Sequence, residues 1–332
     1  MKFNITYTYL GSLWDFAERL SGWHFSYNRR EIDDWLSFTG ALSEKEVAAL
    51  EVIKVMGQEH NEDNDSGDSW LLDRAFITNS EAYAWKAVHE LIGDGQAEKL
   101  RAAIKVMEPR FGKLWPDDEE RLRQRKAMLK QGLSNAKSAE ICEILSSFFQ
   151  PDNAPEEVSI YLLSNGQRNG MQGGANLGPG EITLRCSRTE PISYERMAGP
   201  IWHETTHLYQ QKHYLHWEKK FLAKVKKPAK WQGGYPLYSA FREATVSSLV
   251  WPYGYVASNM LGIEQNYVER YGADFEKLDP RRLYDWGYVF APLHLQAVTK
   301  GYAEDHQSID EDYLNAVLEV WEQYLAHCEN LN

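Results

Sequence analysis

The chain has 332 residues, enough for one large domain or two and for a core that needs no disulfide or metal to hold it together. Charged residues make up 25% of the sequence and hydrophobic residues 43%, which is typical of a globular protein and not of a disordered or fibrous one. The 48 acidic against 36 basic residues give a net charge of −12, which repels nucleic acid and anionic membranes, so neither is expected as a partner.

Neither the amino-terminal segment nor the cysteines point to export. No apolar stretch reaches the 18 or so residues that a membrane span needs, and residues 1–14 have no continuous apolar run for a signal peptide. Cys142, Cys186 and Cys328 are widely spaced and form no C-x-x-C pair. We therefore expect a cytoplasmic protein.

The first 150 residues predict one strand followed by helices. Residues 2–9 alternate apolar and polar side chains, as a strand does, and Gly11 and Ser12 are expected to break it. A capping box, Ser43-x-x-Glu46, predicts the start of a helix. Helical spacing is found in residues 43–57, 80–92, 96–107 and 117–149, the last as one or two helices.

Pro109 and Pro116 predict a loop that makes residue 115 the best candidate for a domain boundary. This divides the chain into a mainly helical N-terminal region of unknown role, residues 1–115, and a second domain, residues 116–332. Between two helices of the first region, residues 58–69 are acidic and rich in turn formers, which predicts a solvated loop. Calcium binding by residues 62–73 is a weaker alternative, since a calcium loop would begin with Asp.

After residue 155 the pattern changes to strands. Residues 158–163 and 181–186 each predict a strand, and we expect them to form a hairpin with a long Gly-rich loop, residues 166–180. That loop lacks the Lys-Ser/Thr ending of a nucleotide-binding loop, and no helix follows it directly. From Ser193 onward the chain is expected to be mostly helical.

The strongest chemical signal lies in this helical part, where His203 and His207 stand four residues apart. On a helix, two such imidazoles project from one face and can bind one ion. Glu204 projects about 100° away and can reach a water molecule beside that ion without binding the ion. Pro200 suits the first turn of the helix. The sequence His203-Glu204-Thr205-Thr206-His207 therefore predicts a metal site in which Glu204 acts as general base.

Two alternatives explain the same residues without a peptidase site. The histidines could cap or pack a helix. Glu204-x-x-His207 also fits the motif of di-iron carboxylate bundles, but such bundles need the motif twice, and no second Glu-x-x-His occurs in this chain.

The HExxH motif and its surroundings, about residues 155–255, resemble the zincin metallopeptidases. In the metzincin branch His213 would be the third ligand, but Gln210 stands where that branch has glycine, so the helix is expected to continue and to carry His213 away. In the gluzincin branch the third ligand is a glutamate on a later helix, and Glu243, 36 residues after His207, lies in a segment of that kind. Glu243 is our preferred third ligand, with His213, His216 and a plain salt bridge of Glu243 as alternatives.

The resemblance also implies supporting residues. Ser247, one turn after Glu243, is a candidate hydrogen-bond partner of a metal-binding histidine. Tyr253, Tyr255 and His294 are candidates for the donor that stabilises the oxyanion of a peptidase reaction. Residues 173–185 are where an extended peptide could lie against an edge strand.

The sequence thus predicts a helix-rich α+β protein, in which a zincin-like catalytic domain packs a small β-sheet on the HExxH helix after a mainly helical N-terminal region. We expect one Zn²⁺ per chain, bound by His203, His207 and Glu243, and a peptidase acting on peptide or protein substrates. A zincin scaffold without catalysis, used for binding or regulation, an interaction protein with an accidental motif, and a zinc amidohydrolase acting on a non-protein amide are the alternatives.

Overall fold

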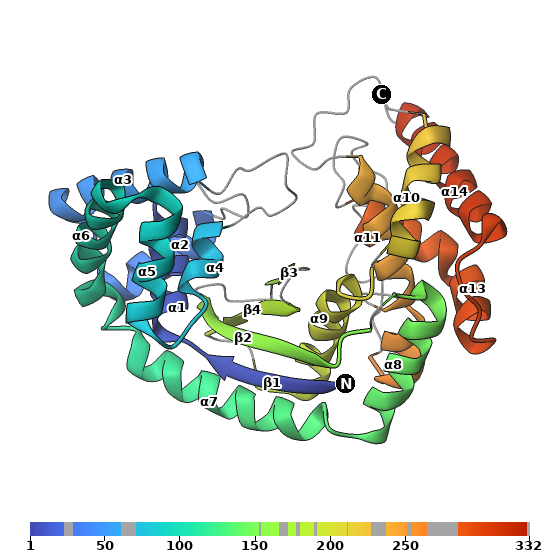
Figure 1. Ribbon diagram of the computed structural model, residues 1–332, viewed down its shortest axis with the longest axis horizontal. Helices are drawn as coiled ribbons and strands as arrows, with labels where there is room; N and C mark the ends of the chain where they lie inside the picture. The colour runs from blue at the N-terminus through green and yellow to red at the C-terminus, as the bar shows by residue number, and fades with distance from the viewer. Residues whose placement is uncertain are drawn as a thin grey trace.

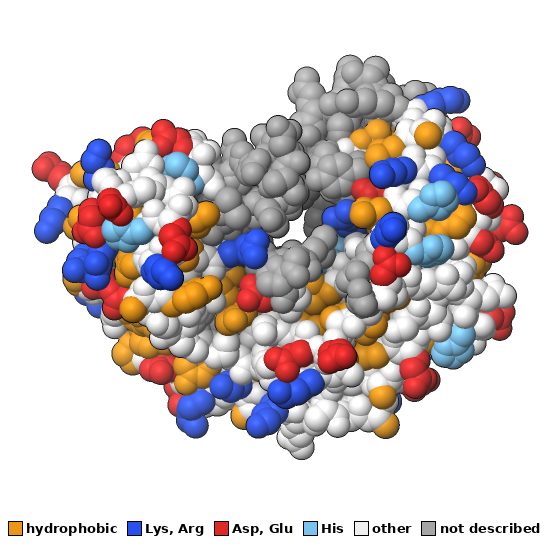
Figure 2. Space-filling view, viewed as in Figure 1, with side chains coloured by type: hydrophobic (Ala, Val, Ile, Leu, Met, Phe, Trp, Pro, Cys, Tyr) orange, Lys and Arg blue, Asp and Glu red, His pale blue; other side chains and the backbone are white. Residues whose placement is uncertain are grey.

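The computed structural model describes residues 1–22, 29–60, 71–152, 154–165, 172–176, 180–188, 191–210, 212–226, 237–250, 254–263 and 285–330. Over these residues the protein is a helix-rich α+β fold, as predicted, with one small sheet. The N-terminal and C-terminal helices stand on either side of the sheet (Figure 1). On the face seen in Figure 2, acidic and basic side chains are interspersed over both groups of helices.

Local sequence signals place the N-terminal elements. Thr8 ends the first strand and caps the first helix, its side chain accepting from the backbone N–H of Gly11. Gly11 and Ser12 therefore lie inside that helix and do not break the strand, contrary to our expectation. The Ser43–Glu46 capping box is confirmed, with the Glu46 carboxylate 2.8 Å from the Ser43 backbone nitrogen. The elements are β1 (Lys2–Tyr7), α1 (Tyr9–Leu20), α2 (Arg29–Thr39), α3 (Glu44–His60), α4 (Leu71–Phe76), α5 (Glu81–Ile92) and α6 (Asp94–Phe111).

The predicted helical stretch 117–149 is two helices, α7 (Trp115–Gly132) and α8 (Ala136–Phe149). Asn135 separates them by capping α8, because its side chain accepts from the backbone N–H of Ser138 at 3.0 Å. Pro109 lies inside α6 and does not begin a loop, as we expected it to. The calcium prediction falls mostly on residues 61–70, which lie outside the described residues.

The sheet has four strands in the order β1-β2-β4-β3, formed by β2 (Glu157–Asn165), β3 (Gln172–Asn176) and β4 (Glu181–Ser187) beside β1. The predicted hairpin between the first two strands after residue 155 is wrong, because β2 and β4 run parallel. The Gly-rich segment itself contains β3, which pairs antiparallel with β4 and takes the place expected for β2. β2 therefore pairs with the opposite edge of β4 and runs parallel to it. β1 in turn pairs parallel with β2.

Two hydrophobic clusters divide the described residues near the predicted boundary. One is built from the helices of residues 13–114, and the other from the sheet and the later helices. Trp115 packs against both clusters. Ile5 of β1 belongs to the second cluster, so the first strand joins the sheet of the later part of the chain. The boundary at residue 115 stays a prediction.

The C-terminal elements surround the second cluster. They are α9 (Tyr194–His207), α10 (Lys212–Lys224), α11 (Tyr238–Leu249), the π-helical turns η1 (Val256–Met260) and η3 (Asp285–Phe290), α13 (Ala291–Glu304) and α14 (Glu311–Asn330). Within the described residues, no helix has both the length and the apolar character to cross a bilayer.

Candidate metal centre

The HExxH residues lie in the last turns of α9. Ser193 caps this helix by accepting from the backbone N–H of Arg196, so Pro200 lies in the middle of α9 and not in its first turn, as we had predicted. The helix is held against the sheet, since it contacts β3 and β4 and the ring of Trp202 meets Phe3 of β1 edge-on at 5.4 Å. The predicted packing of a small sheet on this helix is therefore confirmed.

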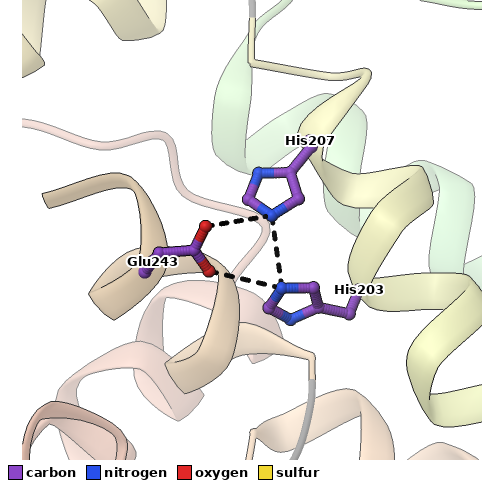
Figure 3. A group of neighbouring side chains, drawn as sticks. All are labelled: His203, His207 and Glu243. Carbon is purple, nitrogen blue, oxygen red and sulfur yellow. Dashed lines mark hydrogen bonds and ion pairs between the residues drawn. The ribbon is translucent and has the colours of Figure 1, made fainter. Parts of the chain in front are cut away.

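The structure brings Glu243 of α11 to the two histidines of α9, and the three side chains converge from the two helices (Figure 3). The two Nε2 atoms of His203 and His207 are 3.2 Å apart. Glu243 places one carboxylate oxygen 3.4 Å from His203 Nε2 and the other 3.5 Å from His207 Nε2. The histidines are buried, and the Glu243 side chain is 16% exposed.

These spacings are those of ligands around one zinc ion. In a tetrahedral site with metal–ligand bonds of about 2.0–2.1 Å, neighbouring ligand atoms stand roughly 3.3–3.4 Å apart. The separation of the two Nε2 atoms, 3.2 Å, and the 3.4 and 3.5 Å from these atoms to Glu243 lie close to that range, the last two ending on different oxygens of the carboxylate. Two imidazoles and one carboxylate leave a fourth position open, as catalytic zinc sites do and closed structural sites do not.

Protonation gives a second reason to expect a cation. His207 Nδ1 lies 2.9 Å from the side-chain oxygen of Gln210, which can only accept, so Nδ1 carries the proton. Burial lowers the pKa of His207 to about 4, which makes the ring neutral at pH 7. Its Nε2 then carries a lone pair, which faces a carboxylate oxygen of Glu243. Such acceptors repel one another unless a proton or a cation lies between them, and the donor set fits Zn²⁺.

Glu204 lies beside this group and is partly exposed. Its pKa is raised to about 7, chiefly by burial and also by the negative charge of Glu243, while His203 and Arg185 oppose the rise. Arg185 comes from β4, where it is buried and pairs with Asp15 of α1 at 2.5 Å. The carboxylate of Glu204 therefore lies within electrostatic reach of a candidate ligand from each helix.

His213 and His216 do not join the group. α9 ends at His207, contrary to our expectation that it continues, and His213 lies on the next helix, α10. There the Nε2 of His213 accepts from the indole N–H of Trp217 at 3.2 Å, and the ring of His216 packs edge-on against the same Trp217. Among the described residues that can bind a metal, only His203, His207 and Glu243 gather in this way.

The predicted oxyanion donors are not brought to the cluster. Tyr255 packs against the second hydrophobic cluster, and its pKa is raised by burial and by Glu304 and Glu140, which belong to α13 and α8. His294 is exposed on α13, where it stacks on Phe290 at 4.1 Å. Tyr253 lies outside the described residues. A role for Tyr255 or His294 as oxyanion donor stays a prediction.

Two residues that shape the site, Gln210 and Gly287, were not among the predicted site residues. Ser247 is buried without a hydrogen-bond partner among the described residues, and the partner of His207 is Gln210 instead. Gly287 of η3 packs directly behind Glu243, since a Cβ atom built on it would lie 2.7 Å from Glu243 Cβ. The position of Gln210, three residues after the second histidine, was the one signal available, and we considered only that it was not glycine.

The chain matches no protein-family model, no curated protein and no solved structure. Its function is therefore inferred from the geometry of the site.

Proposed function

We propose that this protein is a zinc-dependent peptidase in which His203, His207 and Glu243 bind the metal and Glu204 is the general base. The observation that carries the proposal is the convergence of His203, His207 and Glu243, whose ligand atoms all lie within 4.8 Å of one another, beside a partly exposed carboxylate. An HExxH helix backed by a small sheet, with a third ligand from a later helix, also supports the zincin-like and, more narrowly, the gluzincin-like arrangement.

Zinc bound by these residues would supply Lewis acidity, which polarises a carbonyl group and lowers the pKa of a water molecule. Glu204 would take the proton from the attacking water and give it to the nitrogen of the departing amine.

The sheet offers a place for a peptide substrate. β3 is the last strand in the sheet order, and in the described part of the chain no further strand pairs with it. It contacts α9, and its segment Gln172–Asn176 includes Gly173, Gly174 and Ala175, whose small size lets another backbone approach. An extended peptide pairing with β3 would run beside the metal-binding helix.

The test is Glu204→Gln, because this change removes the base while the amide keeps the size of the side chain. We expect zinc binding to be retained and peptide hydrolysis to fall roughly a hundredfold to ten-thousandfold. Hydrolysis is measured as new amino groups released from an unfolded protein and from a mixture of short peptides, and zinc by plasma mass spectrometry. Full hydrolysis by the zinc-loaded variant would disprove the role of Glu204.

A second outcome separates the alternatives. If the wild-type protein binds one zinc per chain but releases no amino groups from any peptide, the peptidase proposal fails. A scaffold used for binding, or an enzyme acting on a non-protein amide, would then fit the same site.

A further inference from the structure

Gln210 lies just after α9, where the chain turns toward α10, and it is buried although its side chain is polar. Its side-chain oxygen is 2.9 Å from Nδ1 of His207, the ring nitrogen on the far side from Glu243. The same imidazole therefore faces the candidate metal position with one nitrogen and the Gln210 amide with the other.

The two ring nitrogens of a neutral histidine have opposite roles, since one carries the proton and the other the lone pair. Whichever group bonds to Nδ1 therefore decides whether Nε2 can bind a metal. An oxygen at Nδ1 can only accept, so it fixes the proton there and leaves the Nε2 lone pair directed at Glu243 and His203. An amide nitrogen at the same place would do the reverse.

The surroundings of Gln210 allow its side chain alone to determine which ring nitrogen of His207 carries the proton. The side-chain amide nitrogen of Gln210 is buried and has no acceptor among the described residues. No other hydrogen bond there therefore competes with the bond to His207. A carboxylate at this position would also accept from Nδ1, but it would add a negative charge to a group that already contains Glu204 and Glu243. Glutamine supplies the acceptor without that charge.

We propose that Gln210 is a positioning residue for the metal centre, which holds His207 in the Nδ1-protonated form so that its Nε2 faces the metal. This inference rests on the proposed zinc site and deepens it. It assigns to Gln210 the role that the sequence analysis gave to Ser247, whose hydroxyl meets no partner in the described part of the chain.

The experiment compares the zinc affinity of the full-length wild-type protein, Gln210→Leu and Gln210→Glu, by competition with a chelator of known affinity. Leucine is close in size but accepts nothing, and we expect its zinc affinity to fall tenfold to a hundredfold. Glutamate restores the acceptor, and we expect it to bring the affinity back to within about threefold of the wild type. Ser247→Ala is the matched control, a second buried polar side chain near the site, and it should leave the affinity unchanged.

A second measurement does not depend on the folding of any variant. The ¹⁵N chemical shifts of the histidine side chains in the zinc-loaded wild-type protein report which ring nitrogen is protonated. For His207, protonated Nδ1 and metal-bound Nε2 are expected, and the opposite assignment would overturn the inference.

The outcomes distinguish this inference from the proposed function. If Gln210→Leu binds zinc as tightly as the wild type, Gln210 has no positioning role and the zinc site stands. If Ser247→Ala weakens zinc binding and Gln210→Leu does not, the partner is Ser247. If the wild-type protein itself binds no zinc, the proposed site fails, and the role of Gln210 fails with it.

Discussion

The N-terminal helices and the α9–α11 region each bury a group of charged and polar side chains, but the two groups differ in how their hydrogen bonds close. In the N-terminal helices, Arg110 is buried and uses all five of its N–H donors. Two reach the Glu46 carboxylate at 2.7 and 2.8 Å, and three reach the Thr39 hydroxyl and the carbonyls of Gly40 and Ala41. Nothing more is needed to satisfy this group.

The cluster of His203, His207 and Glu243 is assembled in the opposite way. The Nε2 lone pair of neutral His207 faces a carboxylate oxygen of Glu243 at 3.5 Å. Two acceptors therefore point toward one another in this cluster. A buried group whose hydrogen bonds are all made within the protein stabilises the fold. A buried group arranged to bind an additional cation lowers the stability of the metal-free fold. In our proposal the Arg110 group is structural and the His203, His207 and Glu243 group binds the metal.

The largest expected effect is that of Glu243→Ala on zinc. Removing one of three protein ligands should weaken zinc binding roughly a hundredfold to a thousandfold, measured by chelator competition. The free energy of unfolding of the metal-free protein should change by less than about 1 kcal/mol, because the change also removes a carboxylate that faces a lone pair.

Glu319→Ala, on the exposed side of α14, is the matched control and should alter neither quantity. Retention of wild-type zinc affinity by Glu243→Ala would exclude Glu243 as a ligand. A large loss of stability without zinc would show that the cluster is structural after all, and the contrast with Arg110 would disappear.

The second prediction concerns the self-satisfied group. Bonding to Arg110 lowers the pKa of Glu46 from its ordinary value of 4.5 to about 2. A lowered folded-state pKa stabilises the fold fully above the unfolded-state pKa, near 4.5, and this stabilisation is lost as the pH falls toward 2. We expect Glu46→Gln to lower the free energy of unfolding by about 2–3 kcal/mol at pH 7, measured with urea.

The difference between wild type and Glu46→Gln should shrink as the pH is lowered from 4.5 to 2. Glu120→Gln is the control, since Glu120 pairs with Arg123 at the surface of one helix and its loss should leave the unfolding midpoint unchanged. An equal effect of both substitutions at pH 7 would mean that the burial of Arg110 adds nothing to its pair with Glu46.

Signals contained within a few residues were readable from the sequence. The Ser43–Glu46 capping box and the start of the helix after Ser80 are confirmed, because a cap and the helix it begins are neighbours in the chain. His203 and His207 face one way for the same reason. Glu243 could be proposed from the sequence because a carboxylate among small and apolar residues on a helix needs a partner. The HExxH motif indicated that this partner could be a metal ion.

What could not be predicted depends on contacts between distant segments. The parallel pairing of β2 with β4 follows from a strand within the Gly-rich segment, which has no apolar alternation to reveal it. Tyr255 and His294 have suitable side chains, but their contacts are with Glu304 and Glu140 and with Phe290, which lie far from them or outside any motif in the sequence. Gly287 acts only through its contact with Glu243, 44 residues earlier, so its own neighbours in the sequence give no sign of it.

Gly287→Ala gives the smallest expected effect and the finest test of the metal centre, because it changes no ligand. The added Cβ would lie 2.7 Å from Glu243 Cβ, closer than side chains can stand, so either α11 or η3 must move. A ligand displaced by a few tenths of an ångström no longer matches the tetrahedral spacing of about 3.3 Å, and we expect zinc affinity to fall about tenfold.

Gly301→Ala is the matched control, because this glycine lies in α13 and a Cβ built on it meets nothing within 4 Å. It should leave zinc affinity unchanged and stabilise the protein slightly, by up to about 1 kcal/mol, since alanine is the better helix former. If Gly287→Ala binds zinc like the wild type while Gly301→Ala behaves as expected, then Glu243 can shift without cost. The site would then tolerate a displacement that the three close separations argue against.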